Sequence, residues 1–530
     1  MKTKSLSDSE RGVAAFLAAH RRDVTGVLSG WDRLRFQGVL RPLYQPTAME
    51  SFLGRIGVRR VEFASYVQSV TQRIRDRAGA WARAAGRSCV YLRKASVSKE
   101  DLAREIVARE KITHGPVCVL SAVEPCRTWQ ARGNHATQHL ELQLLPGKCI
   151  HLYFYLLHER MGLLHLRLQT WFPFLVQVCL NGREWLARQL QAAGVAFTKC
   201  GNCFTQLGDA LQAQKLADAQ DRTDWSAFLE GLLAECHPVH QEVMAPLGLS
   251  YYWTAAQTEY ATDVMFGEVA TLHRLYPKFI RYGLEHFGSE DVLRFLGTKE
   301  PRVQTFQGEV TSDVKRREEG VRLKHRRQGN SLKMYDKQGQ VLRVETTIVH
   351  PEEFKVYRAK EGDPDGQKSW RDLRRGVADL HRRAQVSSAA NGRYLEALVA
   401  TETDHTLAEL WQPLCRRRTR QGRHFRALRP LAAEEWRLLK AINEGAFTSN
   451  GFRNRDLRAA LFGAHSGNRK QRQRQSAAIS RRLALLRAHG LIRKIPGSYR
   501  YHLTHKAYRC INGLFTACSI PLTDLEKLAA

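Results

Sequence analysis

The stretch "NSLKMYDKQGQVLRVETTI", residues 330–348, alternates apolar and polar side chains with a period of two. A period of two places alternate side chains on opposite faces of a β-strand. One face is apolar: Leu332, Met334, Leu342, Val344 and Ile348. The other is polar: Ser331, Lys333, Tyr335, Arg343, Glu345 and Thr347. The segment 337–340 contains Gly339 and suits a tight hairpin between two strands.

The preceding segment "GVRLKHRRQGN", residues 320–330, can supply a third strand with Leu323 facing inward. Its outward-facing side chains would be Arg322, Lys324 and Arg326. We therefore predict a three-stranded meander over residues 321–348 with one buried face. The opposite face gathers polar residues of the kind used in active sites: Lys324, Lys333, Tyr335, Arg343 and Glu345.

The composition points to a polyanionic partner. The chain of 530 residues is long enough for about three or four domains. Hydrophobic residues make up 43%, which permits large cores. Lysine and arginine number 83 against 52 acidic residues, a net charge of +31, and this excess favours nucleic acid. No long basic amphipathic helix with a bulky apolar face favours a membrane surface instead.

The cysteines and the N-terminal sequence bear on the compartment. Eleven cysteines are scattered without a dense framework, which is typical of reduced thiols in a cytoplasm. The N-terminus, "MKTKSLSDSERGVAAF", lacks the apolar core of a signal peptide. The longest apolar run, "WFPFLVQVCL", is too short to span a bilayer. We therefore predict a soluble, cytoplasmic protein.

The pattern along the chain predicts an α+β, multidomain protein with N-terminal and central antiparallel β-sheets, helices and a C-terminal winged helix-turn-helix. The predicted segments are an α/β domain with a β-meander at 1–215, a helical region at 216–300, a central β-meander at 301–360, a basic helical region at 361–412, an Arg-rich linker at 413–430 and the winged helix at 431–520. The central meander can continue the N-terminal sheet. Within the helical region, residues 255–276 would form a helix with Glu259 and Asp263 one turn apart.

The C-terminal segment carries the clearest signal. The expected elements are helices at 431–445, 451–463 and 473–492, a hairpin at 492–504 and a closing helix at 505–515. Gly445 would close the first helix, Asn454 would cap the second, and the hairpin would turn at Pro496-Gly497. Helix, helix, helix, hairpin, helix is the order of elements in a winged helix-turn-helix.

The run "LALLRAHGLIRKIPGSYRYHLTHKA", residues 483–507, resembles the winged-helix segment of MarR-like bacterial regulators. In that family a leucine-rich recognition helix leads into "GLI", a basic wing and "LT". The resemblance implies that the third helix enters the DNA major groove, with these side chains facing the DNA: Arg472, Arg474, Gln475, Ser480 and Arg481. It also implies a wing that contacts phosphate or the minor groove through Arg493, Lys494 and Arg500. Alternatively, these arginines only solvate an exposed helix, or the module contacts RNA or another protein.

Further phosphate contacts are expected from the linker and from the central meander. The run "CRRRTRQGRHFRALRP", residues 415–430, has seven arginines and no acid. Cationic side chains next to a nucleic acid bind its backbone phosphates. The candidates are Arg416, Arg417, Arg418, Lys324, Arg326, Lys337 and Arg343.

The N-terminal β-rich run also alternates, in the segments "QHLELQ", "HLYFY" and "LLHLRLQ". Three adjacent strands could thus present histidines and a carboxylate on one surface, and such a set can hold a divalent metal. The candidate ligands are His139, Glu141 and His165, and Mg²⁺ or Mn²⁺ is the cofactor that we expect. The alternative is the ordinary polar face of a solvated sheet.

The segment "SLKMYDKQGQVLRVE", residues 331–345, resembles a segment of rolling-circle replication initiators and filamentous-phage nicking proteins. The matching residues are Lys333, Tyr335, Asp336, Lys337, Leu342, Arg343 and Glu345. The resemblance implies a metal-binding sheet, a tyrosine that attacks DNA, and catalytic roles for Tyr335, Glu345 and Lys333. The metal motif of that family is His-hydrophobic-His, whereas this chain offers His139-Leu-Glu141 and His165-Leu-Arg167. Alternatively, the Tyr335 hydroxyl only forms a hydrogen bond at a strand edge.

Other residues could supply different chemistry. If Glu345, Glu309 and Asp313 converge, a metal nuclease without tyrosine chemistry becomes the better interpretation. The "CGNC" at 200–203 lacks two further ligands of suitable spacing, so we do not expect a zinc site. The chain has no "GxxxxGK[ST]" and no "HExxH", so we predict neither a nucleotide cofactor nor a zinc protease.

Two functions fit these observations. The first is a mobile-element or plasmid-type DNA-processing protein, similar to a replication initiator or nickase, in which the C-terminal module finds a DNA site. The second is a non-enzymatic DNA- or RNA-binding protein, either a transcriptional regulator or a component of a ribonucleoprotein, whose polar β-faces only bind phosphates.

Overall fold

The computed structural model describes residues 8–94, 96–134, 136, 138–297, 310–317, 320–360, 362–363, 365–399, 406–443, 451–463, 468–495 and 499–521. The chain forms two compact units. Unit 1 contains residues 1–277 and 310–395, and unit 2 contains residues 278–309 and 396–530. Each unit is described by itself.

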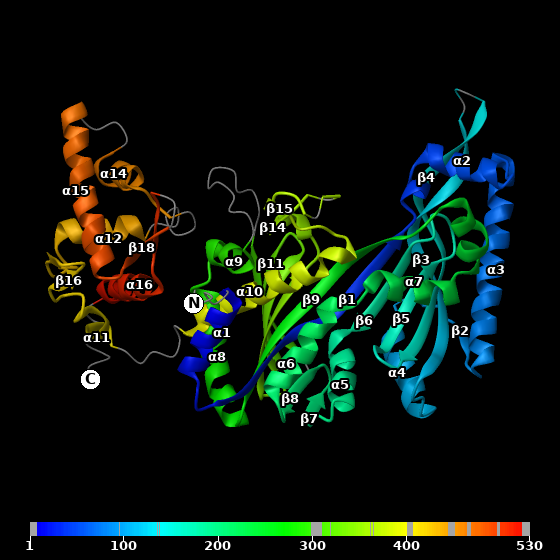
Figure 1. Ribbon diagram of the computed structural model, residues 1–530, viewed down its shortest axis with the longest axis horizontal. Coiled ribbons are helices and arrows are strands. Elements are labelled where there is room, and N and C mark those ends of the chain that lie inside the picture. The colour runs from blue at the N-terminus through cyan, green and yellow to red at the C-terminus, as the bar shows by residue number, and fades with distance from the viewer. Residues whose placement is uncertain are drawn as a thin grey trace. The chain divides into compact units, whose positions relative to one another are not determined.

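Unit 1 is built on one sheet, which has eleven strands within the described residues (Figure 1). Their order across the sheet is β10 (Thr311–Arg317), β11 (Gly320–Arg327), β12 (Asn330–Lys337), β13 (Val341–Ile348), β9 (Tyr252–Phe266), β1 (Val24–Val39), β6 (Val176–Asn181), β5 (Gly162–Gln169), β4 (His139–His158), β3 (Gly115–Asn134) and β2 (Cys89–Tyr91). Neighbouring strands are antiparallel except for β2 and β3. The long strands β1 and β9 pair at the centre, so the N-terminal and central sheets are one sheet, as the sequence allowed.

The predicted meander is confirmed as strands β11, β12 and β13. The hairpin between β12 and β13 turns at Gln338 and Gly339, which both have positive φ angles, of 57° and 68°. Two consecutive positive φ angles characterise the tight turn that matches the twist of paired strands. The register places Lys333 directly opposite Glu345.

The expectation of one buried and one exposed face for this meander is wrong, because every residue of β13 is buried. The apolar face lies against α8 (Val269–Glu285) and α10 (Leu380–Leu398): Tyr276 donates to the Met334 carbonyl, and Asn391 bonds the Thr346 hydroxyl. The polar face is covered in part by the turn between β7 (Phe197–Cys200) and β8 (Cys203–Leu207). Polar residues are buried there because they pair with one another.

The predicted helix at 255–276 is also wrong: residues 252–266 form strand β9, and helix α8 begins only at residue 269. The strand carries polar residues on both faces, which removes the alternation that identifies a half-buried strand. Thr262 bonds Asn391 on one face, and Asp263 bonds Arg343 on the other. Glu259 and Asp263 therefore share a strand face rather than a helix face.

Helices pack on this sheet to form the main core of unit 1. The first helices of the chain are α1 (Asp8–Ala19), α2 (Pro46–Arg55), α3 (Phe63–Ala84) and α4 (Lys99–Arg109), and those that follow β6 and β8 are α5 (Gly182–Ala192), α6 (Ala210–Ala219) and α7 (Trp225–Cys236). Helix α3 buries an apolar stripe at helical spacing: Phe63, Val67, Val70, Ile74, Ala78 and Ala82. The stripe belongs to one cluster with strand residues such as Leu166 and Val178.

The region predicted as basic and helical, 361–412, is mixed. Residues 355–358 and 369–372 form the two-stranded sheet of β14 (Lys355–Arg358) and β15 (Ser369–Asp372). Helix α10 follows and extends to residue 398, and α11 (Leu407–Trp411) belongs to unit 2.

Unit 2 contains the elements that we predicted for its C-terminal part, in the predicted order. They are α12 (Ala433–Ile442), α14 (Asn454–Phe462), α15 (Arg469–Ala488), the hairpin of β18 (Ile492–Lys494) and β19 (Tyr501–Leu503), and α16 (His505–Ser519). Helix α9 (Ser289–Leu296) also lies in this unit. Ile479, Leu483 and Leu486 are buried in the core, as their spacing predicts. Gly445 and the Pro496-Gly497 turn lie outside the described residues.

Two details of unit 2 correct the sequence predictions. Residues 413–430 are not a linker: they contain the hairpin of β16 (Arg418–Arg420) and β17 (Arg423–Phe425), and Leu414 and Leu428 on either side are buried in the core. Asn454 does not cap α14, because Arg453 occupies the cap position. The Asn454 amide instead donates to Ser480 Oγ on α15 at 2.9 Å.

In the part of the chain that the structure describes, no helix combines the length and the apolar character needed to cross a bilayer.

Candidate functional site

Three carboxylates converge on the polar face of the sheet where β1, β9 and β13 run side by side. They belong to Asp32, Glu259 and Glu345, and one oxygen from each lies within 4.8 Å of the others. Asp32 and Glu345 are buried, and Glu259 is half-buried. The three residues come from segments that are far apart in the sequence, so the sheet itself assembles the cluster.

A β-bulge positions Asp32. The register between β1 and β9 passes from Trp31 opposite Tyr260 to Arg33 opposite Glu259, so Asp32 is an extra residue on β1. Bulges redirect a side chain and are frequent next to functional sites. The Asn202 amide in the β7–β8 turn donates to both carboxylate oxygens of Asp32 at 2.9 Å, which fixes the orientation of the carboxylate.

Lys333 is the central cation of the cluster. Its Nζ lies 2.6 Å from Glu345 Oε1 and 3.1 Å from Glu259 Oε1. Burial alone would lower the pKa of Lys333, but the carboxylates of Glu345 and Glu259 outweigh it and raise the pKa above its ordinary value. The ammonium group therefore remains charged at neutral pH, next to two of the three carboxylates.

Arg343 is the second cation and is fully buried. Its guanidinium forms a two-pronged contact with Asp263, at 2.6 and 2.9 Å, and Nη1 lies 3.3 Å from Asp32 Oδ1. Arg183, positioned at the start of α5, also contacts Asp263 at 3.1 Å. Burial would raise the pKa of Asp263, but Arg183 and Arg343 hold it below its ordinary value. Asp263 therefore pairs with two arginines and orients Arg343, but it is not a member of the carboxylate cluster.

Tyr335 lies on the same strand face, two residues from Lys333 and opposite Arg343. The ring is half-buried, and the Lys337 ammonium lies 4.9 Å from its centroid. Burial, with the negative charge of Glu345, raises the pKa of Tyr335 to about 12. The hydroxyl is therefore protonated at neutral pH, and an attack by its oxygen would need a base that accepts the proton.

The other carboxylates that the sequence suggested are not part of this cluster. Asp313 pairs with Lys324 across β10 and β11 and bonds Arg322 at 2.7 Å. Strands β11 and β12 separate it from Glu345 on β13. Glu309 lies outside the described residues. Asp32 was missed, because a single aspartate in a strand of mixed polarity carries no chemical signal until its neighbours are known.

The predicted metal ligands His139, Glu141 and His165 do not form one site. Residues 139–158 form a single strand, β4, which contains both His139 and Glu141. His165 on the neighbouring strand β5 lies opposite Tyr155 of β4, and Tyr155 is fourteen residues beyond Glu141. At the rise of an extended strand this separation is roughly 45 Å. Burial lowers the pKa of His165 to about 4, so its ring is neutral. The predicted alternation of polar and apolar side chains was correct, but the segments "QHLELQ" and "HLYFY", which were expected to form two strands, belong to one strand.

The residues predicted to contact nucleic acid fall into three groups by burial. Arg343 and Lys337 are buried in the site and do not belong to an exposed phosphate-binding surface. In contrast, the following side chains are exposed: Arg326, Arg416, Arg417, Arg418, Arg472, Arg474, Ser480, Arg481, Arg493 and Lys494. Lys324, Gln475 and Arg500 are half-buried. Arg500 donates to the Gly451 carbonyl at 3.3 Å.

No family model, curated protein or solved structure matches this chain.

Proposed function

We propose that this protein binds DNA and carries out divalent-metal-dependent chemistry on a phosphodiester at the cluster of Asp32, Glu259 and Glu345. The observation that supports it is the convergence of three carboxylates within 4.8 Å, beside the buried cation Lys333. Carboxylate oxygens are the ligands that Mg²⁺ and Mn²⁺ prefer. Such a metal would stabilise negative charge on the reacting phosphate and on the attacking or leaving oxygen.

The residues around the cluster fit a bound cation. Asp263 is neutralised by two arginines, so the three clustered carboxylates face Lys333 and a guanidinium that they share with Asp263. Burial, with the charges of Glu345 and Asp263, raises the pKa of Asp32 above its ordinary value although Arg343 and Arg183 oppose this, and a bound divalent ion would stabilise the ionised carboxylate.

Two buried hydroxyls extend the same strand face. Thr347 is opposite Glu259, and Ser331 is opposite Thr347. Neither hydroxyl has a hydrogen-bond partner among the described residues. Buried polar groups are rarely left unpaired, so a bound water, ion or substrate oxygen beside Glu259 would satisfy them.

Within this proposal, Lys333 supplies positive charge next to the reacting phosphate, where it stabilises charge that develops in the transition state. The attacking group is either the Tyr335 hydroxyl, as the resemblance to rolling-circle initiators implies, or water. Because Tyr335 is protonated at neutral pH, attack by its oxygen requires proton transfer to a carboxylate such as Glu345.

We further propose that the C-terminal part of unit 2 is a winged helix-turn-helix that selects the DNA site. The order α12, α14, α15, β18–β19, α16 supports this assignment, as does the resemblance to MarR-like regulators. Helix α15 contains no acidic residue and exposes Arg472, Arg474 and Arg481. An exposed basic helix of this kind suits the major groove.

A non-enzymatic nucleic-acid-binding protein is the second candidate. It is favoured by the short contacts from Lys333 to Glu345 and Glu259, which already pair two of the three carboxylates. Buried ion-pair networks also occur for purely structural reasons. In this case unit 2 would bind phosphates and the cluster would only stabilise the sheet.

The test is incubation of supercoiled and single-stranded DNA with the full chain and Mg²⁺ or Mn²⁺. We expect nicking that is lost in Glu345→Gln and Glu259→Gln, which preserve side-chain size. The matched control is Asp313→Asn on β10, which lies outside the cluster and should retain activity. A covalent protein–DNA adduct that is absent in Tyr335→Phe would identify the tyrosine as the nucleophile, and nicking that persists in Tyr335→Phe would identify water.

Binding of Mn²⁺ to the DNA-free protein, measured by electron paramagnetic resonance, separates the two candidates. Stoichiometric binding that is weakened in Glu345→Gln supports the metal site. Intact DNA in every reaction, with tight and salt-sensitive DNA binding and no Mn²⁺ binding, would establish the non-enzymatic function instead.

A further inference from the structure

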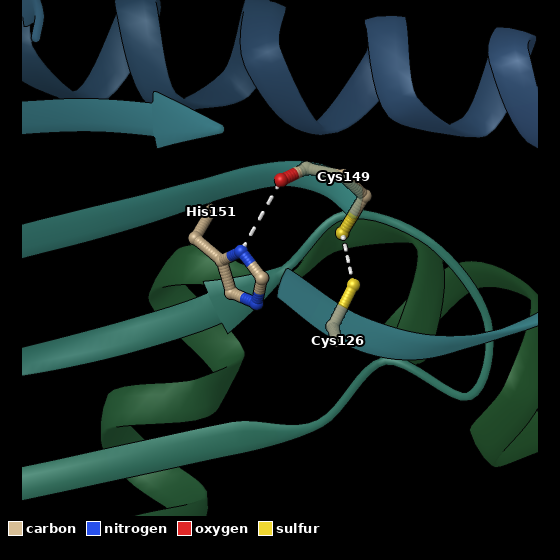
Figure 2. Close-up of side chains that lie close together, drawn as sticks. All are labelled: Cys126, Cys149 and His151. Atoms are coloured by element: carbon tan, nitrogen blue, oxygen red, sulfur yellow. Dashed lines mark hydrogen bonds between the residues drawn. The ribbon is translucent and has the colours of Figure 1, made fainter. Parts of the chain in front are cut away.

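Two thiols and an imidazole meet between strands β3 and β4, on the sheet but away from the carboxylate cluster. They belong to Cys126, Cys149 and His151 (Figure 2). The two sulfurs are 3.4 Å apart, and one ligand atom from each residue lies within 4.8 Å of the others. Strands β5 and β6 separate β4 from β1, so this group is distinct from the proposed phosphodiester site.

The strand register explains why these side chains meet. Cys149 and His151 are two residues apart on β4 and therefore share a face. Cys149 is opposite Glu124, and Cys126, two residues further along β3, reaches it diagonally. Figure 2 shows the imidazole beside the two sulfurs.

The hydrogen bonding of His151 leaves one nitrogen available. Nδ1 lies 3.3 Å from the Cys149 carbonyl oxygen, which can only accept, so Nδ1 carries the proton. Nε2 then has a lone pair, is buried, and has no hydrogen-bond partner among the described residues. A proton held on one ring nitrogen by a backbone carbonyl is the arrangement that prepares the other nitrogen as a metal ligand.

The donor types also suit a metal. Zinc binds cysteine sulfur as thiolate and histidine as neutral imidazole, and a thiol that coordinates the metal loses its proton on binding.

We propose that Cys126, Cys149 and His151 bind a zinc ion, with the fourth position open to water or another ligand. Sulfurs on a tetrahedral zinc ion are about 3.8 Å apart, close to the separation present here. Binding would release both thiol protons to solvent and give a neutral site of two thiolates, an imidazole and a dication. A disulfide would use the sulfurs alone and leave His151 Nε2 unpaired, whereas zinc satisfies all three groups.

The test uses the full chain, freed of metal with a chelator and kept reduced with a phosphine, and titrated with Co²⁺. We expect one cobalt ion per chain with a thiolate-to-cobalt charge-transfer band, which Zn²⁺ then abolishes. Cys126→Ser and Cys149→Ser should lose the band, and His151→Gln should weaken binding by about 100-fold or more. The matched controls are Cys200→Ser and Cys203→Ser, a second pair of cysteines on β7 and β8 that should leave the band unchanged.

A second measurement needs no variant. Zinc X-ray absorption of the wild-type protein should show two sulfur ligands together with nitrogen or oxygen ligands. A shell without sulfur, or with four sulfurs, would overturn the proposal. So would the absence of any thiolate band in a correctly folded protein, or the formation of a Cys126–Cys149 disulfide in air by a protein that binds no metal when reduced.

Discussion

At the scale of single residues, Lys333 is the side chain on which the carboxylate cluster depends most. It is 7% exposed and contacts both Glu345 and Glu259. Removing one partner of a buried ion pair leaves the other charge uncompensated, which costs about 3–5 kcal/mol.

We therefore expect Lys333→Met to lower the free energy of unfolding by about 3–5 kcal/mol in a denaturant titration. Lys324→Met on the neighbouring strand is the control and should change stability far less, because Lys324 is half-buried and its carboxylate neighbour on β10, Asp313, keeps its contact with Arg322. An equal loss of unfolding free energy in both variants would contradict this prediction. It would show that the contacts of Lys333 with Glu345 and Glu259 add no stability beyond that of another lysine in the meander.

His325 makes stability depend on pH. Its ring bonds Ser312 Oγ at 2.8 Å and the Tyr394 hydroxyl at 3.2 Å, and burial lowers its pKa from 6.5 to about 4. Between these values the unfolded chain binds a proton that the folded protein does not, so the free energy of unfolding decreases as pH falls from 6.5 towards 4.

We expect His325→Gln to reduce the slope over that interval without abolishing it, because the buried His151 and His165 contribute in the same direction; denaturation at several pH values measures the slope. His139→Gln, in which the replaced histidine is exposed on β4, should leave the slope unchanged. The slope is the decisive quantity, because a substitution that only disturbs packing lowers stability equally at every pH.

At the scale of elements, alternation predicted β12 and β13 well because each of these strands has one apolar face, and it predicted β11 from Leu323 between two basic residues. It failed for β9, whose polar residues lie on both faces and bond to Asn391 on one side and Arg343 on the other. Such partners are far away in the sequence, so no local pattern could reveal the strand.

The division of β4 into two strands had a different cause. Pro146 and Gly147 signal a turn, but β4 continues through them, paired with β3. Strand β5 pairs with β4 only from His151 onward, so Pro146 lies where β4 has a single described neighbour in the sheet. A proline is tolerated at such an edge because no ladder hydrogen bond from its nitrogen is needed.

Helix α15 gives a prediction for DNA recognition. Arg481 is exposed on this helix, and a residue that reads base edges contributes about 1–3 kcal/mol of discrimination. We expect Arg481→Ala to weaken binding to the preferred DNA sequence about tenfold or more, and to weaken binding to random DNA much less.

Fluorescence anisotropy with the two DNA duplexes measures both affinities. Arg487→Ala, exposed near the end of the same helix, is the control and should affect the two equally. If Arg481→Ala lowered the affinity for both DNA sequences equally, α15 would only bind phosphates and would not read bases.

At the scale of the whole molecule, the sequence indicated the chemistry of the polar face but not the members of the cluster. Glu345 and Lys333 were predicted from the meander and lie together. Glu259 was placed on a helix, and Asp32 was missed, because only the pairing of β1 with β9 and of β9 with β13 brings them to Glu345. The sites of a sheet assembled from distant segments become visible only when the strand order is known.

The net charge of +31 gives the last prediction. Each phosphate that a cation neutralises releases counterions, so the logarithm of the binding constant falls linearly with the logarithm of salt concentration, by about 0.9 per contact on duplex DNA.

Three exposed arginines lie beside and within the hairpin β16–β17: Arg416, Arg417 and Arg418. If they contact phosphates, replacing all three with glutamine should reduce the slope by about two to three. Arg104→Gln and Arg109→Gln in α4, which remove arginines already paired with glutamates, are the controls and should leave it unchanged. A wild-type protein that binds neither DNA nor RNA at low salt would contradict the proposed function entirely, because both candidate functions require its cations to bind phosphates.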